Sequence, residues 1–224
     1  MPAPPWYWTH DAGPEHVARP EPAPWRVARV AAYGPADRRR FATLVHGDPG
    51  PARTVHPDLT AADLTARADA VAVSVSGGRF TVVAEPGRAV PSRALAGASA
   101  AQIRERLAAG ERLLDVDAYA TADGTRYAAV LAADGPGTHF FGDLTLRELR
   151  RGLRRAGVRP VRLRAYAWGA LFAAAAGELP AGRWYTGLSA DQVGRRLDRR
   201  GAWPVDLDAE STPAGIRYAL VMQS

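Results

Sequence analysis

The chain has 224 residues and a formal net charge of +6, and its 47% apolar and 23% charged residues are typical of a globular protein. It contains neither cysteine nor lysine, which excludes disulfides, thiolate metal sites, cysteine nucleophiles, P-loop lysines and the Ser-x-x-Lys motif of serine hydrolases. The first residues show no basic segment followed by an apolar run, and no apolar stretch is long enough to span a membrane. We therefore expect a cytoplasmic protein that makes no membrane contact.

Short strands of alternating polarity recur along the chain, and each is followed by a turn and a second strand. The second strands share an aromatic residue, as in "GGRFTVV" (77–83), "GTRYAAV" (124–130) and "GIRYALV" (215–221). The connections "GG" (77–78) and "TADGT" (121–125) are typical of β-hairpins. The sequence therefore predicts five hairpins, whose first strands are "VARVAAY" (27–33), "VSVS" (73–76), "LLDVDAY" (113–119), "PVRLRAY" (160–166) and "PVDLDAE" (204–210).

Helices are predicted between the hairpins, at 60–69, 99–110, 145–156 and 189–200. Each begins at a serine or threonine that is followed three residues later by Asp, Gln or Glu, which is the pattern of a capping box. These cap residues are Thr60, Ser99, Thr145 and Ser189. The segment 1–24 is rich in proline, so we expect it to be irregular.

The lengths of the connections predict how the elements are arranged. A helix is joined to the next strand by a short segment such as "GVRP" (157–160), whereas "ADGPGTHFFGD" (133–143) and "GELPAGRWYTG" (177–187) lead from a hairpin to the next helix. About ten extended residues span roughly 30 Å, enough to return along a whole strand. We therefore expect an α+β fold in which helix–β-hairpin tandem repeats form a largely antiparallel, curved sheet with the helices on one face. A single repeat domain, 25–224, would contain units at about 25–45, 59–84, 98–131, 144–176 and 188–222.

This unit resembles the bacterial tandem repeat family, whose repeats also occur in the N-terminal region of polyglycine hydrolases and related β-lactamase-like proteins. The resemblance is carried by the capped helix, the glycine stop, "PV-x-L-x-A-Y" and "R-Y-A-x-V", and it extends from Trp25 to Met222. It implies a repeat sheet backed by helices. The catalytic serine domain of the hydrolases has no counterpart here, and its Ser-x-x-Lys motif cannot exist without lysine.

Alternation along the first strand of each hairpin places polar side chains on the face opposite the helices. Charge on this face changes from one unit to the next, with Arg in one and Asp in another. We interpret it as an open, ligand-binding face of a non-enzymatic binding domain, with a small molecule or a peptide as ligand. A solvated face with charge complementarity between units also fits the pattern. The residues expected to bind the ligand are Arg29, Tyr33, Asp117, Tyr119, Arg164, Tyr166 and Asp208.

Two other functions remain open. A small-molecule enzyme would use Asp117 or Asp208 as acid/base groups, although pairing with Arg is expected to keep their pKa values low. Nucleic-acid binding would use the arginines of the last two predicted helices (Arg147, Arg150, Arg151, Arg154, Arg155, Arg195, Arg196, Arg199 and Arg200). Because a GC-rich genome also explains an all-arginine composition, we expect no specific nucleic-acid complex. No metal site and no cofactor are predicted.

Overall fold

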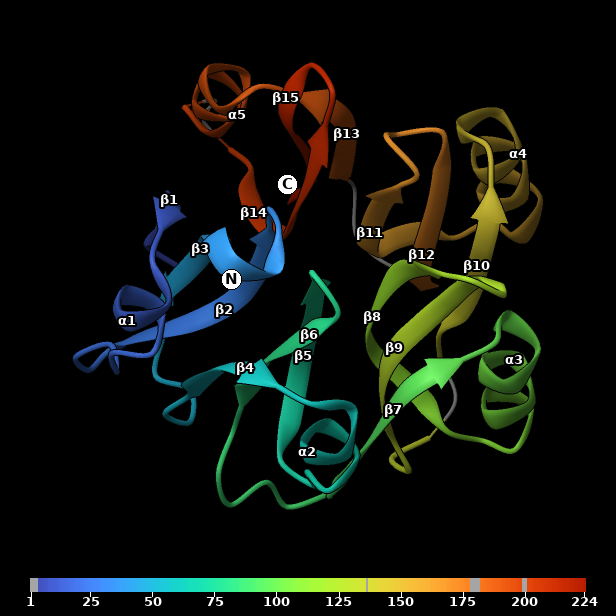
Figure 1. The fold of residues 1–224 in the computed structure, drawn as a ribbon, viewed down its shortest axis with the longest axis horizontal. Coiled ribbons are helices and arrows are strands. Elements are labelled where there is room, and N and C mark those ends of the chain that lie inside the picture. The colour runs from blue at the N-terminus through green and yellow to red at the C-terminus, as the bar shows by residue number, and fades with distance from the viewer. Residues whose placement is uncertain (1–3, 136, 178–181, 199–200) are drawn as a thin grey trace.

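The computed structural model describes residues 4–135, 137–177, 182–198 and 201–224. Strands make up 54% and helices 19%, so the fold is mostly β. The strands form five separate three-stranded antiparallel sheets, which stand side by side in a ring around a central axis (Figure 1). The expectation of an α+β fold with one curved sheet is therefore wrong.

Each sheet has an outer, a middle and an inner strand, and with its helix it is here called a unit, numbered in chain order. The outer strand comes first in the sequence, the inner strand second and the middle strand third. In the order outer, middle, inner, the sheets are β1 (Trp6–Ala12), β3 (Arg40–Gly47), β2 (Trp25–Tyr33); β4 (Thr54–Leu59), β6 (Arg79–Ala84), β5 (Ala70–Ser76); β7 (Ser92–Ala98), β9 (Gly124–Ala132), β8 (Arg112–Thr121); β10 (His139–Leu144), β12 (Leu171–Gly177), β11 (Arg159–Tyr166); and β13 (Gly182–Leu188), β15 (Gly215–Gln223), β14 (Trp203–Thr212).

The hairpins predicted from the sequence are the inner and middle strands, and all five are antiparallel pairs. The outer strands were not predicted. β10 and most of β13 lie in segments that were expected to be return loops, of which 178–181 fall outside the described residues. A segment that runs back along a hairpin meets the free edge of the middle strand, and pairing there satisfies its backbone N–H and C=O groups.

A helix connects the outer strand of each unit to its inner strand: α1 (Pro14–Val17), α2 (Ala61–Thr65), α3 (Ala100–Ala108), α4 (Leu146–Ala156) and α5 (Ala190–Leu197). The last four begin with complete capping boxes at the predicted cap residues, in which the side chain of the cap and that of the third helical residue each accept a backbone N–H. The longest, α4, is too short and too polar to cross a membrane, and the other described helices are shorter still.

The first unit is more regular than the sequence indicates. Within the segment 1–24, which we expected to be irregular, residues 6–12 form β1 and residues 14–17 form the single turn of α1. Proline is compatible with both, because Pro14 occupies the first helical position, where a backbone N–H has no partner in any helix.

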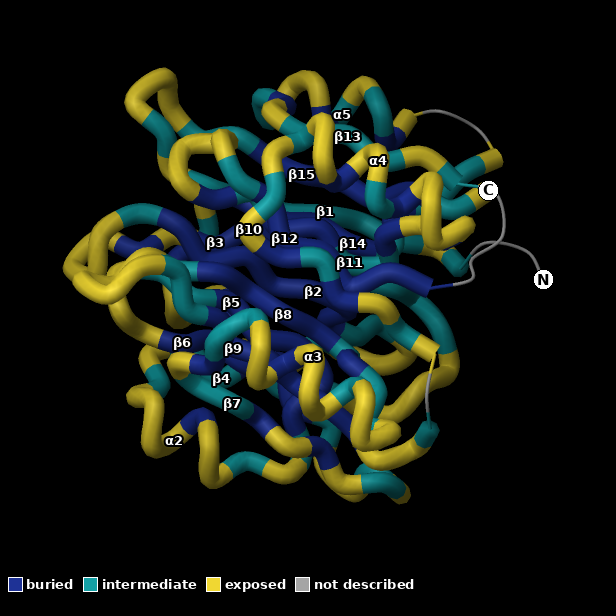
Figure 2. Tube along the Cα trace, turned by 90° about the vertical axis from the view of Figure 1, so that its right-hand side faces the viewer, coloured by how far each residue is buried: buried dark blue, intermediate teal, exposed yellow. Residues whose placement is uncertain are grey.

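The apolar core is divided among the interfaces between units. Five clusters of buried side chains each join two neighbouring units, and one of them joins unit 5 to unit 1. The inner strands contact one another in the order β2, β5, β8, β11, β14 and back to β2. Figure 2 shows these strands buried, with the exposed turns and helices around them. The ring is therefore closed by side-chain packing between the first and last units.

Candidate functional sites

The polar residues of the inner strands lie around the central axis, not on an open face. Each inner strand has a register irregularity near its start, and the residue that follows it is Arg29, Ala72, Asp115, Arg162 or Asp206. Side chains two and four residues further on face the same way. Because five strands surround the axis, each polar face is covered by the others, and Arg29, Asp117, Arg164 and Asp208 are all buried.

Arg164 is the centre of this axial cluster. Its guanidinium lies 2.6 Å from Asp115 Oδ1 and 2.7 Å from Asp206 Oδ2, and only 1% of the residue is exposed. Burial alone would lower the pKa of Arg164, but the surrounding carboxylates raise it. Arg29 Nε lies 3.3 Å from Asp206 Oδ1 without hydrogen-bond geometry. The two arginines and their carboxylates thus form a buried ionic network.

The carboxylates of this network also join the inner strands. Val75 N–H donates to Asp117 Oδ2 at 2.6 Å, and Ala165 N–H donates to Asp208 Oδ2 at 3.0 Å. Asp115 and Asp206 accept from inner-strand N–H groups in the same way. In each case the donor belongs to one unit and the carboxylate to the next. These side chains therefore replace the backbone pairing that separate sheets lack.

Burial dominates the titration of the two axial carboxylates considered for catalysis. It raises the pKa of Asp117 to about 6 and raises that of Asp208 well above its usual value, against the lowering effect of Arg164. The expectation that pairing with arginine keeps these pKa values low is therefore wrong. Both oxygens of Asp117 accept main-chain hydrogen bonds, from Val75 and from Ala118.

One end of the axis holds a small pocket of about 210 Å³. Five of the seven predicted site residues line it: Tyr33, Asp117, Tyr119, Tyr166 and Asp208. The other two, Arg29 and Arg164, do not. Ligand pockets usually enclose about 300 to 1,000 Å³. The sequence therefore identified residues that meet in space, but their arrangement is that of a buried junction between units.

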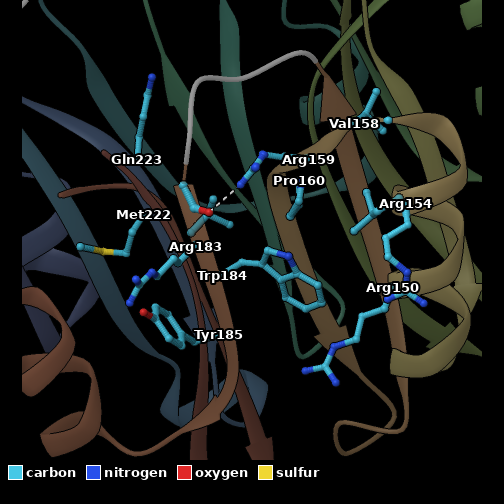
Figure 3. A pocket seen from close by; sticks show the side chains of 14 residues that line it. Arg150, Arg154, Val158, Arg159, Pro160, Arg183, Trp184, Tyr185, Met222 and Gln223 are labelled. Atoms are coloured by element: carbon cyan, nitrogen blue, oxygen red, sulfur yellow. Dashed lines mark hydrogen bonds between the residues drawn. The ribbon is translucent and has the colours of Figure 1, made fainter.

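A larger groove of about 660 Å³ lies between units 4 and 5. One wall is formed by α4 and the start of β11, and the other by β13 and the end of β15 (Figure 3). Its lining includes Arg150, Arg154 and Arg159 on the first wall, Arg183 on the second, and the apolar residues Leu153, Val158, Pro160, Trp184, Val221 and Met222. No carboxylate is among the described residues that line this groove, which we call the arginine groove.

Unlike the first three helices, α4 does not pack against the outer strand of the following unit. Helices α1, α2 and α3 contact β4, β7 and β10 in this way, whereas α4 and α5 make no comparable contact with β13 and β1 in the described chain. The middle strand β12 carries four consecutive alanines, 173–176, and so projects little side-chain volume. The space that a helix fills at the first three interfaces, between units 1 and 4, is left open between units 4 and 5.

Two of the cationic side chains of the groove, Arg150 and Arg159, are held in place. Arg150 lies over the ring of Trp184, 5.5 Å from its centroid, and Arg159 Nη1 donates to the carbonyl of Gly182 at 2.9 Å. Figure 3 shows Arg154 on the same helix as Arg150, whereas Arg183, on the opposite wall, points its side chain away from the groove, on the side of Tyr185. Arginines fixed in this way retain donors for an anion at little further cost in side-chain entropy.

Several residues of the arginine groove stand out in the sequence, but the sequence does not show that they lie together. Arg150 and Arg154 were assigned to a helix face, and Trp184 to a long return loop whose aromatic residues were expected to fill the end of the sheet or to cover its open face. Arg199 and Arg200, from the same set of helix arginines, lie outside the described residues. No signal within one unit shows that α4 and β13 face each other, because that depends on how successive sheets are placed around the axis.

A comparison with protein-family models gives no match, and a comparison with curated proteins finds none that is similar to this chain. The resemblance to the bacterial tandem repeat family therefore stays a prediction.

Proposed function

We propose that this chain is a non-enzymatic binding domain whose arginine groove binds an acidic peptide. The observation that carries the proposal is a set of three arginines, Arg150, Arg154 and Arg159, beside an apolar lining, with no carboxylate among the described lining residues. Guanidinium groups bind carboxylates through two parallel hydrogen bonds, which are stronger than neutral ones. A peptide is one of the two ligand classes anticipated from the sequence, the other being a small molecule, and the groove replaces the axial residues as its site.

The shape and lining of the groove favour a ligand that is both anionic and apolar. The half-buried Trp184 offers surface for one apolar side chain, with Leu153, Val158 and Val221 buried in the lining, while Arg150, Arg154 and Arg159 lie on the wall formed by α4 and β11. Its volume of about 660 Å³ is within the usual range for ligand pockets. A peptide with acidic residues on both sides of a leucine or phenylalanine satisfies both requirements.

The chemistry of the lining supports binding without catalysis. The described residues around the groove include no Ser, Thr, His, Asp or Glu, and Tyr185 supplies the only hydroxyl group among them. General acid–base and nucleophilic catalysis both need a group that takes up a proton near neutral pH. Arginine does not serve this purpose, because it stays protonated.

Nucleic-acid binding is the second candidate, since Arg150, Arg154 and Trp184 could contact phosphates and a base. Proteins that bind single strands stack bases on exposed aromatic faces. Here the guanidinium of Arg150 lies over the ring of Trp184, so one face of that ring is already occupied. An acidic peptide needs no free aromatic face, and we prefer it for this reason.

The test is fluorescence anisotropy with a labelled peptide of sequence Glu-Glu-Leu-Glu-Glu, using Lys-Lys-Leu-Lys-Lys as the control peptide. We expect the double variant Arg150→Ala/Arg154→Ala to weaken binding at least tenfold, because each charged hydrogen bond contributes about 1.5 to 3 kcal/mol. The matched control is Arg151→Ala/Arg155→Ala, which removes the same charge from exposed positions of α4 outside the groove. Equal weakening by both double variants would show that only net charge matters, and would contradict the proposal.

A further inference from the structure

A tyrosine at the end of the inner strand fills the interface with the preceding unit in three of the five units. Tyr33 meets Tyr218 of unit 5, Tyr119 meets Phe80 of unit 2, and Tyr166 meets Tyr127 of unit 3. The first two pairs are edge-to-face, with ring centroids 6.4 and 5.8 Å apart. Each tyrosine thus extends into a slot whose inner wall is an aromatic ring of the neighbouring middle strand.

A backbone N–H at the end of the outer strand binds the hydroxyl group of two of these tyrosines. Asp11 N–H donates to the hydroxyl oxygen of Tyr33 at 2.7 Å, and Asp143 N–H donates to that of Tyr166 at 2.9 Å. The corresponding residue Gly97 lies beside the hydroxyl group of Tyr119. Asp11, Asp143 and Gly97 all have positive φ, which turns the N–H toward the slot. The slot is therefore a repeated binding site for a phenol ring.

In unit 2 the slot has another occupant. Ser76 stands where the tyrosine would be, and the side chain of Arg39 enters the slot instead. Its guanidinium lies 5.5 Å from the centroid of the Phe41 ring and forms an ion pair with Asp58. Arg39 is 5% exposed, so this slot is closed.

The slot of unit 5 is empty. Glu210 replaces the tyrosine, and it turns aside so that its Oε1 accepts the N–H of Trp168 at 2.6 Å. A cavity of about 430 Å³ remains between units 4 and 5, at the end of the interface opposite the arginine groove. It is lined by Phe172, the equivalent of the aromatic wall, and by Gly187, the equivalent of Gly97 and Asp143.

We propose that this cavity binds a para-substituted phenol, in the place that tyrosine takes in the other units. The ring would lie against Phe172, and the hydroxyl oxygen would accept the N–H of Gly187, whose φ of +69° matches the +75° of Gly97. The para substituent would point toward Glu210, whose Oε2 is buried and has no hydrogen-bond partner among the described residues. A donor on that substituent, such as an amine or amide N–H, would pair with it.

The rim of the cavity fits an aromatic ligand. Trp168 lines it and is 74% exposed, the one large apolar side chain of the described chain that lies so open. Ala167 and Trp168 both have positive φ, at +52° and +60°, and the N–H of Trp168 is fixed by Glu210. A ring that enters the cavity passes this indole, which adds aromatic contact area.

The test is an NMR titration of the full chain with 4-methylphenol, which is the side chain of tyrosine as a free molecule. We expect the amide resonances of Gly187 and Trp168 to shift with saturation, and toluene, which lacks the hydroxyl group, to bind about tenfold more weakly. A blocked Gly-Tyr-Gly peptide separates the sources of the phenol. Binding of the peptide indicates a tyrosine of a partner, and binding of 4-methylphenol alone indicates a free phenol.

Two variants distinguish the proposed phenol site from a nonspecific aromatic site, because they should change the Tm in opposite directions. Glu210→Tyr is expected to fill the slot from within, abolish binding of 4-methylphenol and raise the Tm by about 3 °C or more. Ser76→Tyr, at the equivalent position of the slot already occupied by Arg39, is expected to lower the Tm. No saturable shift at Gly187 with either phenol, or equal affinity for toluene and 4-methylphenol, would overturn the proposal without bearing on the arginine groove.

Discussion

Tyr33 and Tyr218, from the first and last units, meet edge to face with their ring centroids 6.4 Å apart and an angle of 81° between the rings. Trp8 of unit 1 packs against the same Tyr218 at 5.8 Å. These contacts join the two ends of the series of units, so the ring depends on side chains that are far apart in the sequence.

A double-mutant cycle measures this closure. Tyr33→Leu and Tyr218→Leu each remove a buried ring, and we expect a coupling energy of about 0.5 to 1.5 kcal/mol between them, as found for aromatic pairs. The free energy of unfolding of the wild type, both single variants and the double variant gives this value from urea denaturation. Additive losses would mean that the two rings are not in contact in solution.

Replacement of the central arginine should destabilise the fold strongly. Arg164→Met keeps much of the volume but leaves Asp115 and Asp206 buried without their main counterion, and breaking a buried ion pair in this way costs about 3 to 5 kcal/mol. Chemical denaturation of the variant is compared with that of Arg155→Met, an exposed arginine on α4. A loss below about 1 kcal/mol for Arg164→Met would contradict the ionic network.

The stability of the protein should fall as the pH rises from about 4 to about 6.5 through the contribution of Asp117. In the folded state its pKa is about 6, against 3.8 for the unperturbed group. Between these values the folded protein binds more protons than the unfolded chain, so raising the pH favours unfolding, by about 1 to 3 kcal/mol in total.

The comparison is with Asp117→Asn, which has no proton to lose. The free energy of unfolding of this variant should lack that part of the pH dependence, whatever its absolute stability. Parallel pH profiles for the two proteins between pH 4 and 6.5 would show that the pKa of Asp117 is not raised.

We expect nucleic acid to bind weakly, through nonspecific attraction between its phosphates and the net positive charge of the protein. We expect the affinity for single-stranded DNA, measured by filter binding, to disappear between low salt and about 0.2 M salt, because released counterions supply the driving force. A complex that survives at that salt concentration would make nucleic-acid binding the leading function.

Features encoded within a few neighbouring residues were predicted correctly from the sequence. Thr145 and Glu148 form the expected capping box, as do the three other pairs, because this geometry needs only residues three apart. The hairpins follow from alternation and from turn residues such as Gly77 and Gly78, both of which have positive φ.

The outer strands and the separation of the sheets were not predicted, because they depend on pairing partners. β13 includes Arg183, Trp184 and Tyr185 but lacks a regular alternation, and it is a strand only because the edge of β15 lies beside it. In the same way, Asp117 and Asp208 have the polar pattern of an exposed face. They become buried only when five such faces close around one axis.

We expect the ligand to bind at the interface between units 4 and 5. Hydrogen–deuterium exchange, measured by mass spectrometry with and without the Glu-Glu-Leu-Glu-Glu peptide, locates the binding region. Exchange should become slower in 150–160 and 182–188, with no change in the equivalent segments of units 3 and 4, 104–113 and 139–144. Protection of those equivalent segments, or of the axial strands at 115–119 and 204–210, would contradict it.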